Sequence, residues 1–116
     1  LGCLGQGDIG DFFPDDDPAY ADINSAILLA EILDMAQKAS LSIDHVDMTI
    51  ICQTPRLSPW KAQIKKNLAT LIGLEDEQVC IKATTEEGLG FTGEKKGIKT
   101  VVVVTGSRPL KFKGET

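Results

Sequence analysis

The sequence predicts a fold that combines α-helices with a partly parallel β-sheet. Apolar residues recur at helical spacing in two segments, whereas three other segments alternate apolar and polar residues or are continuously apolar. These segments follow one another in the order helix, strand, helix, strand, strand. The strand over 46–53, the helix over 59–72 and the strand over 78–83 form one crossover unit, which we expect to be parallel and right-handed.

The first predicted helix begins near Asn24 or Ser25 and runs to about Ala39, because apolar side chains form a broad stripe at helical period between these limits. An acidic segment over 7–22 precedes it, and its six aspartates and two prolines indicate a loop. This segment lacks the spacing of acidic residues and glycine that defines an EF-hand, so we do not expect it to bind calcium.

The first predicted strand starts at Val46, where apolar and polar residues begin to alternate. His45, the only histidine, should be a surface residue just before this strand. The next helix should be capped by Ser58, begin at Pro59 and stop at Gly73, because these residue types favour those positions.

The last predicted strand covers 98–105. Its four consecutive valines at 101–104 imply burial on both faces of a sheet. We expect residues 1–105 to form a single domain and residues 106–116, which are rich in lysine, glycine and proline, to be a flexible tail.

Composition restricts the partners of this chain. It has 116 residues and a formal net charge of -5, which argues against nucleic acid because no basic face is available for phosphates. No apolar run approaches the roughly 20 residues that span a bilayer, and no signal or transit sequence is visible. Cys3, Cys52 and Cys80 form no Cys-x-x-Cys pair, which fits a reducing cytoplasm. We expect Cys52 and Cys80 to be small buried hydrophobic residues within strands.

The segment 82–93 carries the strongest indication of chemistry. A strand ends in Thr84 and Thr85, two carboxylates follow, and then comes a Gly-x-Gly-x-x-Gly spacing. Hydroxyl and backbone N–H groups at a strand end can hold phosphate oxygens, and a nearby carboxylate can hold a cation. Local spacing alone favours a capping box instead, with Thr84 as N-cap and Glu87 three residues later. A Rossmann motif is not indicated, because no long amphipathic helix follows the glycines.

Three segments occur in a characteristic order: GDIGDFFPDDDP at 7–18, VDMTIICQTPRLSP at 46–59 and KATTEEGLGFTGEKKGI at 82–98. Together they resemble the 2-C-methyl-D-erythritol 2,4-cyclodiphosphate synthase family, and the resemblance extends from residue 1 to about 105. It implies an α+β fold with helices packed on one face of a mixed β-sheet. It also implies a homotrimer around a central axis, in which the valines at 101–104 would meet neighbouring subunits.

The resemblance implies a lyase of non-mevalonate isoprenoid biosynthesis that acts on a small-molecule cytidine diphosphate derivative. The substrate is 4-diphosphocytidyl-2-C-methyl-D-erythritol 2-phosphate, and the products are 2-C-methyl-D-erythritol 2,4-cyclodiphosphate and CMP. The 2-phosphate attacks the β-phosphorus of the same molecule, so no side chain needs to act as a nucleophile. The protein must fold the substrate and neutralise its phosphates. The implied cofactors are zinc and a second divalent ion, magnesium or manganese.

The family holds zinc with an Asp-x-His pair, a His-Ser-Asp-Gly-Asp block and a further histidine, and this sequence contains none of them. We therefore expect the chain to be the larger, C-terminal part of a subunit, without activity on its own. Its location should be the bacterial cytoplasm, or a plastid if a transit peptide was removed. Two alternatives stay open: a non-catalytic trimeric module that binds cytidine nucleotides without zinc, and a small regulatory domain without a nucleotide site.

The resemblance also implies roles for individual residues. Glu87 should bind the second divalent ion, and Thr85 should donate to the transferred phosphate; these are the two catalytic residues. Arg56 stands where the family often has lysine and should reach the α-phosphate. Asp8 and Gly10 should hold the ribose hydroxyls.

The loop over 52–58 should form the cytosine pocket through its backbone groups, although by itself it reads as an ordinary turn bounded by prolines. Ala83 and Thr84 should line the cytidine, while Phe13 and the nearby aspartates should surround the methylerythritol. The implied substrate-binding residues are Asp8, Gly10, Phe13, Asp15, Asp17, Cys52, Gln53, Thr54, Pro55, Arg56, Leu57, Ser58, Ala83, Thr84 and Phe91.

Overall fold

The computed structural model describes residues 1–14, 16–20, 23–85 and 97–110. As far as they are described, these residues form two compact units. The first unit comprises Leu1–Ser42 and Gly106–Thr116, and the second unit comprises Ile43–Thr105. The expectation of a single domain over 1–105 stays a prediction.

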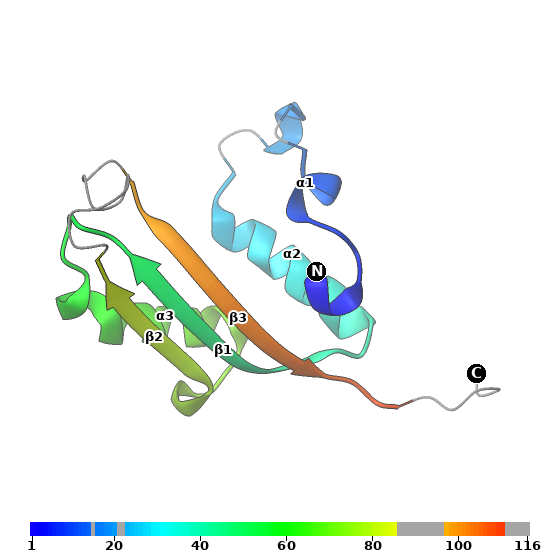
Figure 1. The fold of residues 1–116 in the computed structure, drawn as a ribbon. Helices are drawn as coiled ribbons and strands as arrows, with labels where there is room; N and C mark the ends of the chain where they lie inside the picture. Colours follow the sequence, from blue (N-terminus) through cyan, green and yellow to red (C-terminus); the bar gives the residue numbers. More distant parts are fainter. Residues whose placement is uncertain (15, 21–22, 86–96, 111–116) are drawn as a thin grey trace. The chain divides into compact units, whose positions relative to one another are not determined.

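A three-stranded sheet forms the centre of the second unit (Figure 1). Its strands are β1 (Ser42–Ile51), β2 (Val79–Thr84) and β3 (Lys99–Ser107), in the spatial order β2-β1-β3. β1 and β2 are parallel, β3 runs in the opposite direction, and α3 (Lys61–Ile72) joins β1 to β2 and packs against β2. The predicted α+β class, the mixed sheet and the parallel pairing of the crossover unit are confirmed.

The register of β1 and β2 places most of their apolar residues on one face. Val46 pairs with Val79, each 2% exposed, and Ile50 pairs with Ala83 further along. Ala69 of α3 is 3% exposed, and its small side chain allows the helix to approach closely. Burial of a valine side chain contributes about 1.5–3 kcal/mol, so this face supplies much of the stability of the unit.

The opposite face of the same two strands is polar. Asp47 and Lys82 form an ion pair across it at 3.0 Å, with both side chains partly exposed. Cys80 pairs with Asp47 on this face and is exposed, so its expected burial is wrong. The cause is the alternation of side chains along β2, which directs Cys80 away from the face that buries Val79.

β3 differs from expectation in burial and in length. The valines at 101–104 are 48%, 43%, 60% and 40% exposed, so the expected burial on both faces is not found in a single chain. β3 lies at one edge of the described sheet, and its side chains on both faces remain in contact with solvent. The strand also includes Gly106 and Ser107, two residues beyond the predicted end.

The first unit contains the predicted long helix as α2 (Ser25–Lys38). Asn24 caps it, since its Oδ1 accepts a hydrogen bond of 2.8 Å from the backbone N–H of Ala26. Near the other end the Asp34 carboxylate lies 2.9 Å from Lys38 Nζ, and this hydrogen bond and charge attraction raise the pKa of Lys38. No helix in the described part of the chain is long and apolar enough to cross a membrane.

The described part of the acidic segment is partly helical, whereas a loop was expected. It contains the short helices α1 (Ile9–Phe12) and η2 (Pro18–Tyr20), and η1 (Gly2–Leu4) precedes it. Asp8 Oδ1 accepts from the backbone N–H of Asp11 at 3.2 Å, and Asp11 Oδ2 accepts from that of Asp8 at 3.1 Å. This reciprocal capping box was missed because aspartates were read as breakers rather than caps.

Two other boundaries differ from the sequence prediction. β1 begins at Ser42, so His45 lies within the strand and is half-buried, rather than on the surface before it. A 3₁₀ turn, η3 (Ser58–Trp60), precedes α3, and Ser58 makes no side-chain cap.

The predicted helix stop is confirmed. Gly73 has a φ of 82°, a left-handed conformation that favours glycine, and its N–H donates to the carbonyl of Ala69 at 2.8 Å. The 3₁₀ turn η4 (Asp76–Gln78) then leads into β2.

Candidate functional site

A pocket with a volume of about 150 Å³ opens where β1 and β2 end. Parallel neighbouring strands carry their carboxyl ends to the same edge of a sheet, so the segments that follow β1 and close β2 meet there. The lining residues are Cys52, Arg56, Leu57, Ser58, Ala83, Thr84 and Thr85. All seven were assigned to one site from sequence, and the structure brings them together. Their individual roles stay predictions.

Cys52 links the two walls of this pocket. Its backbone N–H donates to the carbonyl of Thr84 at 3.0 Å, which extends the parallel ladder beyond the end of β1. Its thiol donates to the carbonyl of Thr54 at 3.0 Å, and the residue is only 4% exposed. Cys52 is therefore buried as expected, although it follows the strand instead of belonging to it.

The remainder of the loop turns back toward α3. Arg56 and Ser58 are exposed, whereas Leu57 is half-buried and its carbonyl accepts from the N–H of Trp60 at 2.8 Å. The guanidinium of Arg56 is permanently charged and donates to oxygen anions in a forked geometry. Arg56, Thr84 and Thr85 all line the pocket, and this combination of a cation with two hydroxyl-bearing residues suits a phosphate or diphosphate group.

Three predicted residues of the same loop do not line the pocket: Gln53, Thr54 and Pro55. Within the described part of the chain, the side-chain oxygen Oε1 of Gln53 is buried and accepts no hydrogen bond. Leaving such an acceptor unsatisfied costs about 1–3 kcal/mol, so this loop has unused capacity to bind a donor.

The remaining predicted residues divide into two groups. Asp8, Gly10, Phe13 and Asp17 belong to the first unit. There the carboxylate of Asp8 caps α1, Asp17 Oδ1 accepts from the N–H of Ala19 at 2.9 Å, and Phe13 is 8% exposed. The second group lies outside the described residues and consists of Asp15, Glu87 and Phe91.

A metal site requires several ligand side chains that converge on one point. The described ranges contain no group of three or more histidine, cysteine, aspartate or glutamate side chains placed to hold one ion. They therefore do not fit a zinc ion, which takes three protein ligands at a catalytic position.

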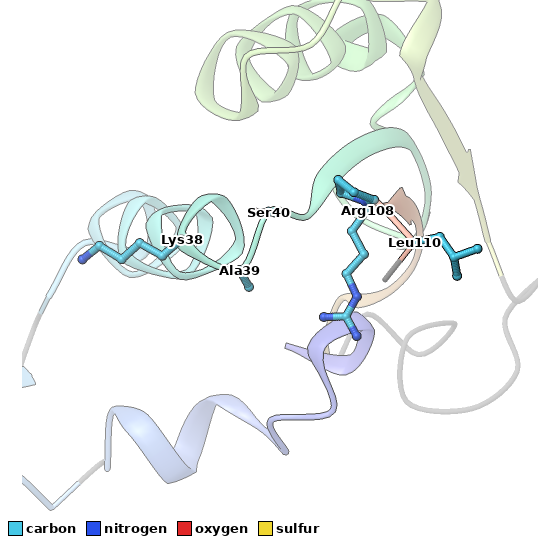
Figure 2. Close-up of a pocket in the computed structure, with 6 residues that line it drawn as sticks. Lys38, Ala39, Ser40, Arg108 and Leu110 are labelled. Carbon is cyan, nitrogen blue, oxygen red and sulfur yellow. The ribbon is translucent and has the colours of Figure 1, made fainter. Parts of the chain in front are cut away.

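Two larger hollows do not bring together side chains suited to one ligand. One, of about 430 Å³, lies beside the start of β2 and includes His45, Lys61 and Glu77 among its lining residues. The other, of about 660 Å³, follows the end of α2 (Figure 2). Its charged groups Lys38 and Arg108 point in different directions, and Leu110 is 80% exposed. The smallest of the three hollows therefore carries the best candidate site.

Comparison with known proteins finds that this chain is similar to the members of one family. The sequence pattern of the YgbB family matches residues 1–106. The bifunctional enzyme IspD/IspF of Nitratidesulfovibrio vulgaris is 56% identical over 110 residues, which are 95% of this chain and 28% of that protein. The 2-C-methyl-D-erythritol 2,4-cyclodiphosphate synthase of Syntrophomonas wolfei is 47% identical over 104 residues, 90% of this chain and 66% of that protein. The chain thus spans less than two thirds of either relative.

A solved structure agrees with the fold. IspF of Plasmodium falciparum, in a complex with CDP, superposes with a TM-score of 0.81 at 34% sequence identity. The match covers 93% of this chain and 64% of that one. The similarity therefore extends over most of this chain.

Proposed function

The chain belongs to the YgbB family, and we propose that it serves the cyclodiphosphate synthase reaction of isoprenoid biosynthesis. In this reaction 4-diphosphocytidyl-2-C-methyl-D-erythritol 2-phosphate yields 2-C-methyl-D-erythritol 2,4-cyclodiphosphate and CMP. The observation that carries the proposal is the pocket that joins the loop after β1 to the end of β2. The CDP bound to the similar Plasmodium falciparum protein supports a cytidine nucleotide as its occupant.

The reaction needs positioning more than it needs a reactive side chain. An oxygen of the 2-phosphate attacks the β-phosphorus, the bond from that phosphorus to the α-phosphate oxygen breaks, and CMP leaves. Bringing both groups together within one bound molecule can supply about 7–11 kcal/mol of the barrier. In the proposed arrangement the loop backbone holds the cytosine, Arg56 holds the α-phosphate, and Thr85 donates to the β-phosphate as charge develops.

The size of the pocket supports a site that is completed by another subunit. Its volume of about 150 Å³ is below the roughly 300–1,000 Å³ of small-molecule sites in general. The exposed valines at 101–104 offer an apolar surface for association. We therefore propose a homotrimer with active sites between subunits.

The cofactors are also part of the proposal. Glu87 would bind a second divalent ion, magnesium or manganese, that neutralises phosphate charge. The described residues supply no zinc site, so zinc would have to be held by groups outside them. Elemental analysis of the complete native protein tests this: a molar content of zinc near one per subunit supports it, and a metal-free active protein contradicts it.

Binding of CMP tests the pocket directly. We expect the complete protein to bind CMP more tightly than AMP, because backbone groups placed to read the edge of cytosine would not match the edge of adenine. Calorimetry gives both affinities, and the single tryptophan, Trp60, follows the loop closely enough to report binding by fluorescence. Equal affinity for the two nucleotides would contradict the proposal.

Turnover and assembly complete the test. Phosphorus NMR of a reaction with the diphosphocytidyl substrate should show a cyclic diphosphate and CMP in equal amounts. Light scattering of the complete protein at micromolar concentration should give three times the subunit mass. A monomer with full turnover would contradict the proposal that the active sites lie between subunits. It would not contradict the proposed reaction.

A further inference from the structure

We propose that Cys52 is a positioning residue, whose thiol holds the Thr54 carbonyl and thereby fixes the path of the loop that reads the base. This inference rests on the proposed function, because it assigns a role within the same pocket. It differs from a role in direct contact, since the thiol acts on substrate through Thr54 and the residues that follow.

The contacts of Cys52 define this role. Its backbone N–H binds the carbonyl of Thr84, and its thiol binds the carbonyl of Thr54, both at 3.0 Å. The first bond holds the end of β2, and the second holds the beginning of the loop that returns to line the pocket. Cys52 therefore connects both walls of the pocket. Its backbone binds the end of β2, and its side chain binds the loop.

Burial makes the second bond effective. Cys52 is 4% exposed, so its thiol is held in one place by the surrounding side chains and meets the carbonyl of the exposed Thr54 from the buried side. When that donor is removed, the loop is free to shift relative to β2. Because the loop reads the base with backbone atoms, a displacement of its path changes base recognition first. Phosphate binding by Arg56, whose long side chain can adjust, should change least.

The test compares three variants of the complete protein. Cys52→Ala removes the donor, Cys52→Ser retains a donor at the same atom position, and Cys80→Ala is a matched control at an exposed thiol outside the pocket. For each protein, calorimetry gives the dissociation constants of CMP, AMP and inorganic pyrophosphate, and a thermal melt gives the midpoint temperature.

We expect Cys52→Ala to raise the dissociation constant of CMP about 2- to 12-fold, the range expected for one net hydrogen bond. The preference for CMP over AMP should fall by a similar factor, while the dissociation constant of pyrophosphate stays within about twofold of that of the unmodified protein. Cys52→Ser should restore CMP binding, and Cys80→Ala should change none of the three constants.

Unchanged CMP affinity and preference in Cys52→Ala would overturn the inference. So would equal loss of all three ligands together with a lower melting midpoint and no rescue by serine, because that pattern indicates packing alone. If the unmodified protein does not prefer CMP to AMP, the proposed function fails, and this inference fails with it. The CMP-over-AMP preference of the unmodified protein therefore distinguishes failure of the proposed function from failure of this inference alone.

Discussion

The same resemblance assigns the loop over 52–58 and the acidic segment over 7–18 to substrate binding. Among the described residues of these two segments, only those of the loop line the pocket at the ends of β1 and β2. The loop meets the end of β2 and forms a pocket with it. The acidic segment belongs to the other unit, and its polar groups mostly serve short helices. Asp8, for example, exchanges hydrogen bonds with Asp11.

The difference shows how each kind of site depends on the rest of the chain. A pocket at the ends of two parallel strands forms as soon as the strands pair, because pairing fixes both of its walls. A segment of aspartates and glycines has local hydrogen bonds of its own. Its assignment to a ribose requires a second surface, which one chain need not provide.

The largest expected effect concerns the hydroxyl of Thr85. Thr85→Ala in the complete protein should lower turnover about 10²–10³-fold, the usual loss when one preorganised donor to the transition state is removed. Glu87→Gln should have a similar effect if that carboxylate binds the second ion. Turnover is measured alongside the melting midpoint, with Thr70→Ala on the exposed face of α3 as a matched control.

A normal rate with a clear loss of stability would place Thr85 in the structure of the strand end and not in the reaction. Glu87 as a helix cap would give the same pattern, at a cost of about 1 kcal/mol in stability.

A smaller effect is expected at the charged rim of the pocket. Arg56→Met should raise the dissociation constant of CMP about tenfold or more, because a hydrogen bond to a charged group contributes about 1.5–3 kcal/mol. Cytidine, which lacks the phosphate, should bind both proteins equally well. Arg108→Met is the matched control, since Arg108 lies in the first unit. Equal weakening of cytidine and CMP would show that Arg56 shapes the loop instead.

The smallest effect should distinguish the two roles of Asp8. Asp8→Ala should cost about 1 kcal/mol of stability through loss of the N-cap, and Asp8→Asn should retain most of it. If Asp8 also holds the ribose, both variants should reduce the preference for CMP over deoxy-CMP. Calorimetry with the two nucleotides decides this: an unchanged preference leaves Asp8 with a cap role alone.

Much of the second unit could be predicted from the sequence, because its pattern reflects local rules. The alternation from Val46 onward, the glycine stop at Gly73 and the parallel pairing of β1 with β2 all agree with the structure. The first four residues of β1 were missed because Ser42 and Asp44 are polar and exposed, so they resemble a connection. Their backbone pairing does not depend on those side chains.

The candidate site was predictable in its membership and not in its contacts. All seven lining residues followed from the resemblance and the strand order. The bond from the Cys52 thiol to Thr54 did not, because nothing in local spacing indicates where a loop carbonyl points. Cys80 shows the same limit, since hydrophobic character alone does not decide which face of an edge strand a thiol occupies.

The exposed valines of β3 also affect the tendency of the protein to aggregate in a cell. The run over 100–105 has high β-propensity, no charge and no proline, and it lies on an edge strand of the described sheet. Such a segment is a template for aggregation through strand pairing between chains. Lys99 and Arg108 stand close to its two ends, in the positions where charged gatekeepers discourage stacking. Chains in which this strand stays uncovered would therefore be the fraction most prone to precipitation and to capture by chaperones.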